Sequence, residues 1–210
     1  MKKIHNYVDG KSFSISKNEL PVEDPSTGEE IAKVTLSSSD DFEKILNSSK
    51  KSQFEWAKTT PLKRSRILSN YKTLIEKNID ELAEIVSREH GKTLADAKGS
   101  VTRGLEVVEF ACGIPHLLKG EFSQNVGTNI DSWSIRQPLG VCAGITPFNF
   151  PAMVPMWMFP VAIACGNSFV LKPSEKDPSC PMKLAELAIQ AGLPPGVLNC
   201  VNGDKEAVDT

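Results

Sequence analysis

Apolar and polar residues alternate in two short stretches near the start of the chain. Residues 4–11 read IHNYVDGK, and an alternating run that ends in Asp9 and Gly10 predicts a β-hairpin that turns at this pair. Residues 31–35 form a second short run after the turn-rich segment 22–29. We therefore expect the chain to open with short strands.

Between residues 39 and 112 the apolar positions change to helical spacing, which predicts four consecutive helices. Their ends carry the usual signals: a hydroxyl cap, a proline in the first turn or a glycine stop. We interpret the apolar stripes as core packing and assign no cofactor role to them. The expected boundaries are an N-cap at Ser39, a cap and first turn at Thr60 and Pro61, a third helix over 80–89 that stops at Gly91, and a fourth over 94–112.

The last part of the chain has the pattern of an α/β sheet. Residues 141–146 are small and apolar, as in a strand covered on both faces, and residues 152–165 are apolar nearly all round, as in a buried helix. A strand at 168–171, a helix over 181–191 and a strand over 197–201 follow. This β-α-β-α-β order predicts part of a Rossmann-like doubly wound parallel sheet, preceded by the N-terminal helical region.

Polar side chains follow the first two strands of this series. Asn149 lies between Pro147 and Pro151, and Lys172 and Glu175 follow the second strand. Ligands of open α/β sheets bind outside the carboxyl ends of the strands, and a lysine with a glutamate can donate to and accept from ribose hydroxyls. From spacing alone, a solvated loop with an exposed ion pair is the favoured alternative. The usual G-x-G-x-x-G fingerprint does not follow the first strand.

Composition narrows the class of protein. The 210 residues carry a formal net charge of −2, which gives no reason to expect nucleic acid or an anionic membrane surface as a partner. No apolar run approaches the length of a membrane span, and no secretory signal is visible, so we expect a cytoplasmic protein. The five cysteines and three histidines are scattered without metal-ligand spacing, so we expect free thiols and no metal.

Two motifs resemble a known family. Residues 146–151 read TPFNFP and residues 171–175 read LKPSE, and in this order and at this separation they resemble the aldehyde dehydrogenase superfamily. The resemblance extends over essentially the whole chain. Phe148, where many relatives carry tryptophan, and the segments 107–121 (VVEFACGIPHLLKGE) and 172–178 (KPSEKDP) are similar to the CoA-acylating methylmalonate-semialdehyde (malonate-semialdehyde) dehydrogenase branch.

The resemblance implies an NAD-dependent oxidation of a small-molecule semialdehyde with CoA as co-substrate. A cysteine thiolate adds to the aldehyde, hydride leaves to NAD, and the resulting thioester is passed to CoA. By resemblance, Asn149 is the catalytic residue that stabilises the oxyanion, whereas on its own it could equally form an Asx-turn. Arg103 would bind the distal carboxylate of the substrate, whereas without the family it reads as a helix-surface charge.

The same resemblance assigns cofactor-binding residues in both motifs. Those of the first motif would line the nicotinamide side, and those of the second would hold the adenosine ribose and the adenine or phosphate. Glu175 would repel a 2′-phosphate and favour NAD over NADP, although Lys176 could attract one. The expected cofactor-binding residues are Thr146, Pro147, Phe148, Lys172, Ser174, Glu175 and Lys176.

The resemblance also divides the chain. Residues 1–119 would supply N-terminal strands and helices of the cofactor domain, and residues 141–210 the first βαβαβ of the NAD-binding domain. Residues 120–140, which have an extended alternating pattern, would form the oligomerisation arm of a homo-oligomer.

We expect the chain to be an N-terminal portion of such an enzyme, without the catalytic domain and its nucleophile. None of the five cysteines has the family's nucleophile context, and Cys142 and Cys165 lie in apolar stretches typical of inert thiols. Alone, the chain is therefore expected to be inactive. The alternatives are a catalytically inactive nucleotide-binding or subunit-association module of this fold, and an unrelated Rossmann-like domain.

Overall fold

The main sheet has five strands in the order β3-β2-β10-β9-β8, and the computed structural model describes residues 2–210. The last three strands of that order run parallel, which confirms the predicted partial Rossmann-like sheet. The predicted N-terminal hairpin is also confirmed, with Asp9 and Gly10 at φ 53° and 74°, and it adds two antiparallel strands next to β10. The strands are β2 (Asn6–Val8), β3 (Lys11–Phe13), β8 (Val141–Ile145), β9 (Ser168–Lys172) and β10 (Leu198–Cys200).

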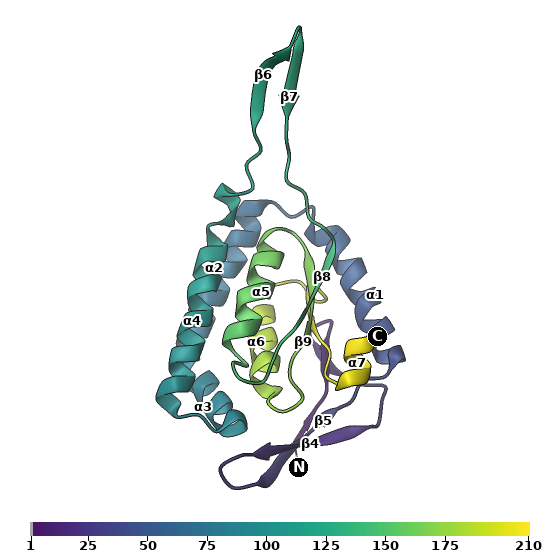
Figure 1. Ribbon diagram of the computed structural model, residues 1–210, viewed down its shortest axis with the longest axis vertical. Coiled ribbons are helices and arrows are strands. Elements are labelled where there is room, and N and C mark those ends of the chain that lie inside the picture. Colours follow the sequence, from purple (N-terminus) through teal and green to yellow (C-terminus); the bar gives the residue numbers. More distant parts are fainter. Residues whose placement is uncertain (1) are drawn as a thin grey trace.

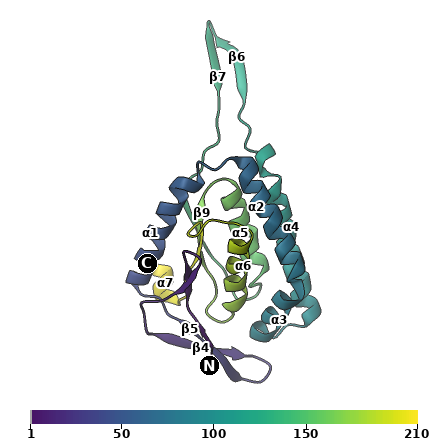
Figure 2. The same ribbon diagram turned by 180° about the vertical axis from the view of Figure 1, so that it is seen from behind.

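Helices cover both faces of this sheet (Figures 1 and 2). Helix α1 (Ser39–Trp56) packs on one face, and α5 (Met153–Ala164) and α6 (Ser179–Gln190) pack on the other. An outer layer then covers α5 and α6, made of α2 (Pro61–Lys77), α3 (Ile79–His90) and α4 (Leu94–Cys112). Every residue of β9 is buried, as expected for a strand enclosed by two helical layers.

The helix boundaries agree with the sequence signals to within one residue, except at the start of α6. The N-cap of α1 is Ser38, one residue before the predicted Ser39, because Ser38 and Asp41 form a capping box in which each side chain bonds the other's main chain. Helix α6 starts two residues earlier than expected, because Pro181 fits within a first turn whose amides need no intrahelical partner. Helix α3 ends at Gly91, which has φ 84°.

The position of α5 is fixed at both its side and its end. Gly104 of α4 faces it, and a Cβ there would lie 3.3 Å from the Cα of Met153, tighter than an ordinary contact, so glycine lets the two helices approach closely. At the end of α5, Trp56 Nε1 donates to the carbonyl of Ile163 over 2.9 Å, and buried Arg64 Nε donates to that of Ala164 over 2.8 Å. These bonds satisfy carbonyls that a helix end leaves unpaired.

Two smaller sheets lie outside the main one. The first has the order β1-β5-β4 and packs near α3. The second is the hairpin of β6 and β7, which projects from the body (Figure 1). It lies in the segment that was predicted to be extended, and its two strands pair with each other. Within residues 2–210 no helix is long and apolar enough to cross a bilayer. The remaining elements are β1 (Lys2–Ile4), β4 (Glu19–Asp24), β5 (Glu29–Thr35), η1 (Ile114–His116), β6 (Phe122–Gly127), β7 (Ile130–Trp133) and α7 (Lys205–Asp209).

Candidate functional site

The two sequence motifs lie side by side at the carboxyl edge of the parallel sheet. Ile145, the last residue of β8, pairs with Lys172, the last residue of β9, and the amide of Thr146 donates to the carbonyl of Lys172 over 3.0 Å. The residues after each strand, the 146–151 turn and the 172–176 segment, therefore leave the sheet as neighbours. This is the edge at which ligands of open α/β sheets bind.

The lysine and the glutamate of the 172–176 segment form a largely buried ion pair. Lys172 Nζ lies 2.9 Å from Glu175 Oε2, and the two side chains are 9% and 32% exposed. Burial opposes ionisation of Glu175, but the hydrogen bond from Lys172, a main-chain hydrogen bond and the charges of Lys172 and Lys176 together outweigh it and keep the pKa of this carboxyl below its usual value. The interpretation as an exposed ion pair on a solvated loop is therefore wrong. A buried ammonium with one of its three donors used has donors left for a ligand.

Ser174 shapes this segment from within. It is 8% exposed, and its hydroxyl accepts a hydrogen bond from the amide of Lys176 over 3.1 Å. A serine that bonds the amide two residues on forms a local turn. That turn brings Glu175 back beside Lys172 and leaves Lys176 exposed.

The first motif places one buried hydroxyl and several exposed groups at the same edge. Thr146 is 4% exposed, and its Oγ1 has no hydrogen-bond partner within residues 2–210. Pro147, Phe148 and Asn149 are exposed, and the ammonium of Lys176 lies 4.8 Å from the centroid of the Phe148 ring. The two motifs thus meet through this cation–π contact.

Two cavities flank the 146–151 turn. The first, of about 550 Å³, is lined by Phe148, Glu175 and Lys176 on one side and by residues of β4 on the other. The second, of about 590 Å³, brings Asn149 together with Arg103 of α4, two residues that are 46 positions apart in the sequence. Three of the predicted cofactor residues, Phe148, Glu175 and Lys176, therefore line the first cavity, whereas Asn149 and Arg103 line the second.

A lysine that sequence reasoning missed lies against the same turn. Lys92 Nζ donates to the main-chain carbonyl of Asn149 over 2.9 Å and lies 4.5 Å from the centroid of the Phe150 ring. Burial lowers the pKa of Lys92, while Asp177 and Asp96 oppose that shift. In the sequence, the only signal for Lys92 was its position directly after Gly91, which ends α3. That position indicates a loop but does not show which group the lysine contacts.

A pair of buried carboxyls, also missed, lies beneath the cofactor segment. Asp177 is 2% exposed, and neither of its oxygens has a hydrogen-bond partner within residues 2–210. Burial, and then repulsion from Glu89, raises the pKa of Asp177 to about 8. Glu89 accepts from the amide of Ser179 over 2.9 Å, and burial raises its pKa as well. Both residues line the cavity beside Phe148 and Glu175.

The five cysteines are all unpaired thiols. Burial raises the pKa of each one, whereas a nucleophilic cysteine needs a lowered pKa. Among residues 2–210, no group of three or more histidine, cysteine, aspartate and glutamate side chains could hold a metal ion.

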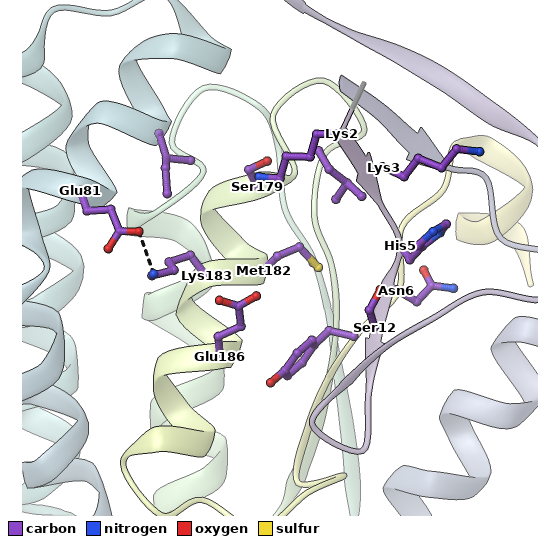
Figure 3. Close-up of a pocket in the computed structure, with 13 residues that line it drawn as sticks. Lys2, Lys3, His5, Asn6, Ser12, Glu81, Ser179, Met182, Lys183 and Glu186 are labelled. Atoms are coloured by element: carbon purple, nitrogen blue, oxygen red, sulfur yellow. Dashed lines mark hydrogen bonds and ion pairs between the residues drawn. The ribbon is translucent and has the colours of Figure 1, made fainter. Parts of the chain in front are cut away.

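A smaller pocket of about 260 Å³ lies away from both motifs, between the N-terminal strands and helices α3 and α6 (Figure 3). Its wall includes an ion pair in which Lys183 Nζ lies 2.7 Å from Glu81 Oε1. It contains none of the predicted site residues, so the candidate site is the carboxyl edge of the sheet and not this pocket.

Comparison with known proteins gives one consistent family. The model of the aldehyde dehydrogenase family matches residues 13–210. The chain is 52% identical over 209 residues to a malonate-semialdehyde dehydrogenase of Pseudomonas aeruginosa, covering all of this chain and 42% of that protein. It is 50% identical over 202 residues to an acylating, mitochondrial methylmalonate-semialdehyde dehydrogenase of Arabidopsis thaliana, covering 95% of this chain and 33% of that protein.

Similar solved structures belong to the same family of enzymes. A protein of Sinorhizobium meliloti assigned as a methylmalonate-semialdehyde dehydrogenase, complexed with NAD, has a TM-score of 0.98 and 54% identity. A methylmalonate-semialdehyde dehydrogenase of Oceanimonas doudoroffii has a TM-score of 0.98 and 51% identity. Each match covers 100% of this chain and 43% of the other. The chain thus spans about two fifths of the length of these relatives.

Proposed function

The chain belongs to the aldehyde dehydrogenase family, and we propose that it is the N-terminal part of an NAD-dependent, CoA-acylating methylmalonate- or malonate-semialdehyde dehydrogenase. The observation that carries this proposal is the meeting of the 146–151 turn with the buried pair of Lys172 and Glu175 at the carboxyl edge of the sheet. High identity to relatives named for these semialdehydes supports the substrate class.

The residues at this edge fit NAD. Lys172 has free donors, Glu175 is an ionised acceptor beside it, and Thr146 has a buried hydroxyl without a partner within residues 2–210, so the edge offers several unused polar groups beside the cavity of about 550 Å³ that Glu175 lines. Lys172 and Glu175 would hold the ribose, with Lys176 near the adenine or phosphate. Thr146, Pro147 and Phe148 would line the nicotinamide side, and Ser174 keeps the segment turned. When bound, NAD supplies the hydride acceptor for the oxidation.

Asn149 and Arg103 would act on the substrate from the neighbouring cavity. The Asn149 amide would donate to the oxyanion that develops on the aldehyde carbon's oxygen, where a fixed donor lowers the barrier. Arg103 would hold the distal carboxylate with two parallel hydrogen bonds, which selects a semialdehyde over an alkyl aldehyde. Lys92 lines the same cavity, with its ammonium bonded to the carbonyl of Asn149.

The test is a steady-state assay of the protein in its full length. We expect NADH to form with malonate semialdehyde only when CoA is present, and more slowly when NADP replaces NAD. Oxidation of simple alkyl aldehydes to free acids without CoA would contradict the proposed branch.

A second candidate function is a nucleotide-binding or subunit-association module without turnover. It is favoured by the raised pKa of every thiol in residues 2–210, which leaves no activated nucleophile among them. Two measurements on the 210-residue chain alone test this second function. We expect calorimetry to show that NAD binds, and we expect the dehydrogenase assay to show that no NADH forms. CoA-dependent turnover by this chain would reject the module and our interpretation of its cysteines.

The cytoplasmic location and the domain division stay predictions.

A further inference from the structure

The turn that carries Asn149 has few hydrogen bonds of its own. Pro147 and Pro151 have no amide hydrogen, and within residues 2–210 no hydrogen bond is donated by the amides of Phe148, Asn149 or Phe150. The first turn of α5 holds only the carbonyl of Phe150, which accepts from the amide of Val154 over 3.2 Å. The position of Asn149 therefore depends on contacts from elsewhere in the chain.

Lys92 supplies that contact. Its ammonium donates to the carbonyl of Asn149 over 2.9 Å and sits 4.5 Å from the centroid of the Phe150 ring. Hydrogen bonds from charged donors are stronger than those between neutral groups, and the ring face adds a second attraction. Lys92 makes no ion pair within residues 2–210, so the hydrogen bond of its ammonium goes to the carbonyl of the turn, while the charges of Asp96 and Asp177 act on it from a greater distance.

The loop that presents Lys92 is itself held firmly. Ser87 Oγ donates to the carbonyl of Lys92 over 2.7 Å, and Thr93 caps α4 by accepting from the amide of Asp96. Gly91 has φ 84°, and a Cβ there would lie 2.7 Å from Cγ of Pro25, so the loop packs tightly against the β4–β5 turn. A donor on a fixed loop can hold a carbonyl in one place.

We propose that Lys92 is a positioning residue, which fixes the main chain of Asn149 so that the Asn149 amide is aimed at the developing oxyanion. This proposal rests on the proposed function. A displacement of about 1 Å at a catalytic group can cost about 100-fold in rate. Loss of one main-chain anchor should therefore reduce turnover without touching the cofactor or the substrate carboxylate.

The test uses Lys92→Met in the full-length protein, because methionine keeps the length of the side chain but removes its charge and donors. We expect kcat to fall by about 10- to 100-fold, with KM for the semialdehyde and the Kd of NAD within about threefold of wild type. Lys92→Arg, which retains a donor, should recover most of the activity. The matched control is Lys98→Met, which removes an exposed lysine of α4 that pairs with Asp80.

A double-mutant cycle tells positioning from a general structural role. If Lys92 acts through Asn149, adding Lys92→Met to Asn149→Ala should cost no more than about threefold beyond Asn149→Ala alone. Additive losses would overturn the proposal. So would a Lys92→Met variant that loses no more activity than Lys98→Met.

Hydrogen exchange provides a readout that does not need activity. In Lys92→Met, the amide of Val154, which donates to the carbonyl of Phe150, should exchange faster than in wild type, while the amides of β9 should not change. Unchanged exchange at the turn would overturn the positioning role. If exchange rises but the wild-type protein oxidises no semialdehyde, the proposed function fails and the anchoring of the turn stands.

Discussion

Lys172 donates from Nζ to Oε2 of Glu175 over 2.9 Å while its own side chain is 9% exposed. The carboxylate beside this buried ammonium compensates for part of the hydration that burial removes. The pair sits at the end of β9, next to the start of the 146–151 turn, where we propose that it holds the ribose of the cofactor. The buried ion pair therefore supports the predicted cofactor site more strongly than either residue would alone.

Lys172→Met should weaken NAD binding by about 10- to 100-fold, because it removes hydrogen bonds from a charged donor. The measurement is the Kd of NAD by calorimetry. Lys183→Met, which breaks the more exposed pair with Glu81, is the control and should leave that Kd unchanged. Equal affinities for both variants and wild type would remove Lys172 from the cofactor site.

Asn149→Ala should lower kcat of the full-length enzyme by about 10²–10³, the size of one lost oxyanion donor. Because Asn149 is exposed at the turn and makes no side-chain hydrogen bond within residues 2–210, the folded structure should be little affected. The check is a kcat measurement with a melting curve and the Kd of NAD. A variant with near-normal kcat would return Asn149 to a simple turn role.

Arg103→Met should raise KM for malonate semialdehyde by about 10- to 100-fold, because the substrate loses a charged hydrogen-bond partner. Activity toward an uncharged alkyl aldehyde, however low, should not fall. The comparison of the two substrates in kcat/KM is the measurement. An equal fall in kcat/KM for both substrates would mean that Arg103 does not bind the substrate carboxylate.

Asp177 should make the protein less stable as the pH rises from about 4 to about 8. Burial and Glu89 raise its pKa from 3.8 to about 8, so the folded chain keeps this proton where the unfolded chain has lost it. The unfolded state then binds fewer protons, and the free energy of unfolding falls with pH across that window.

Asp177→Asn should remove this loss, raising the free energy of unfolding at pH 8 by about 1–3 kcal/mol and flattening its dependence on pH. Thermal melts at several pH values between 4 and 9 measure it. Glu84→Gln, at an exposed position of α3, is the control and should leave the slope intact. A variant with the wild-type slope would show that Asp177 is not the titrating group.

The β6–β7 hairpin should mediate association. Phe122 and Trp133 face each other across its strands and are 65% and 68% exposed, an apolar pair that a lone hairpin leaves in water. Changing both to serine should lower the mass seen by light scattering. Phe54→Ser, at a position on α1 that is 63% exposed, should not. An unchanged mass in the double variant would exclude the hairpin as an interface.

The sequence by itself determined the elements and the edge where the site lies. Periodicity placed the β8-α5-β9 unit, and the cap and proline at Thr60 and Pro61 placed the start of α2, because these signals act between residues close in the chain. Parallel strands joined by one helix must end at the same edge, so the meeting of the two motifs also followed from local pattern.

Only the tertiary structure decided which groups are buried and which distant residues touch. The hairpin at Asp9 pairs with β10, and Lys92 reaches the carbonyl of Asn149, 57 positions away, through contacts that no local pattern encodes. Lys172 and Asp177 are 7% and 2% exposed, and the burial of Asp177 beside Glu89 of α3 raises its pKa. Periodicity reports which face of an element is apolar, whereas the packing of elements sets what lies opposite that face.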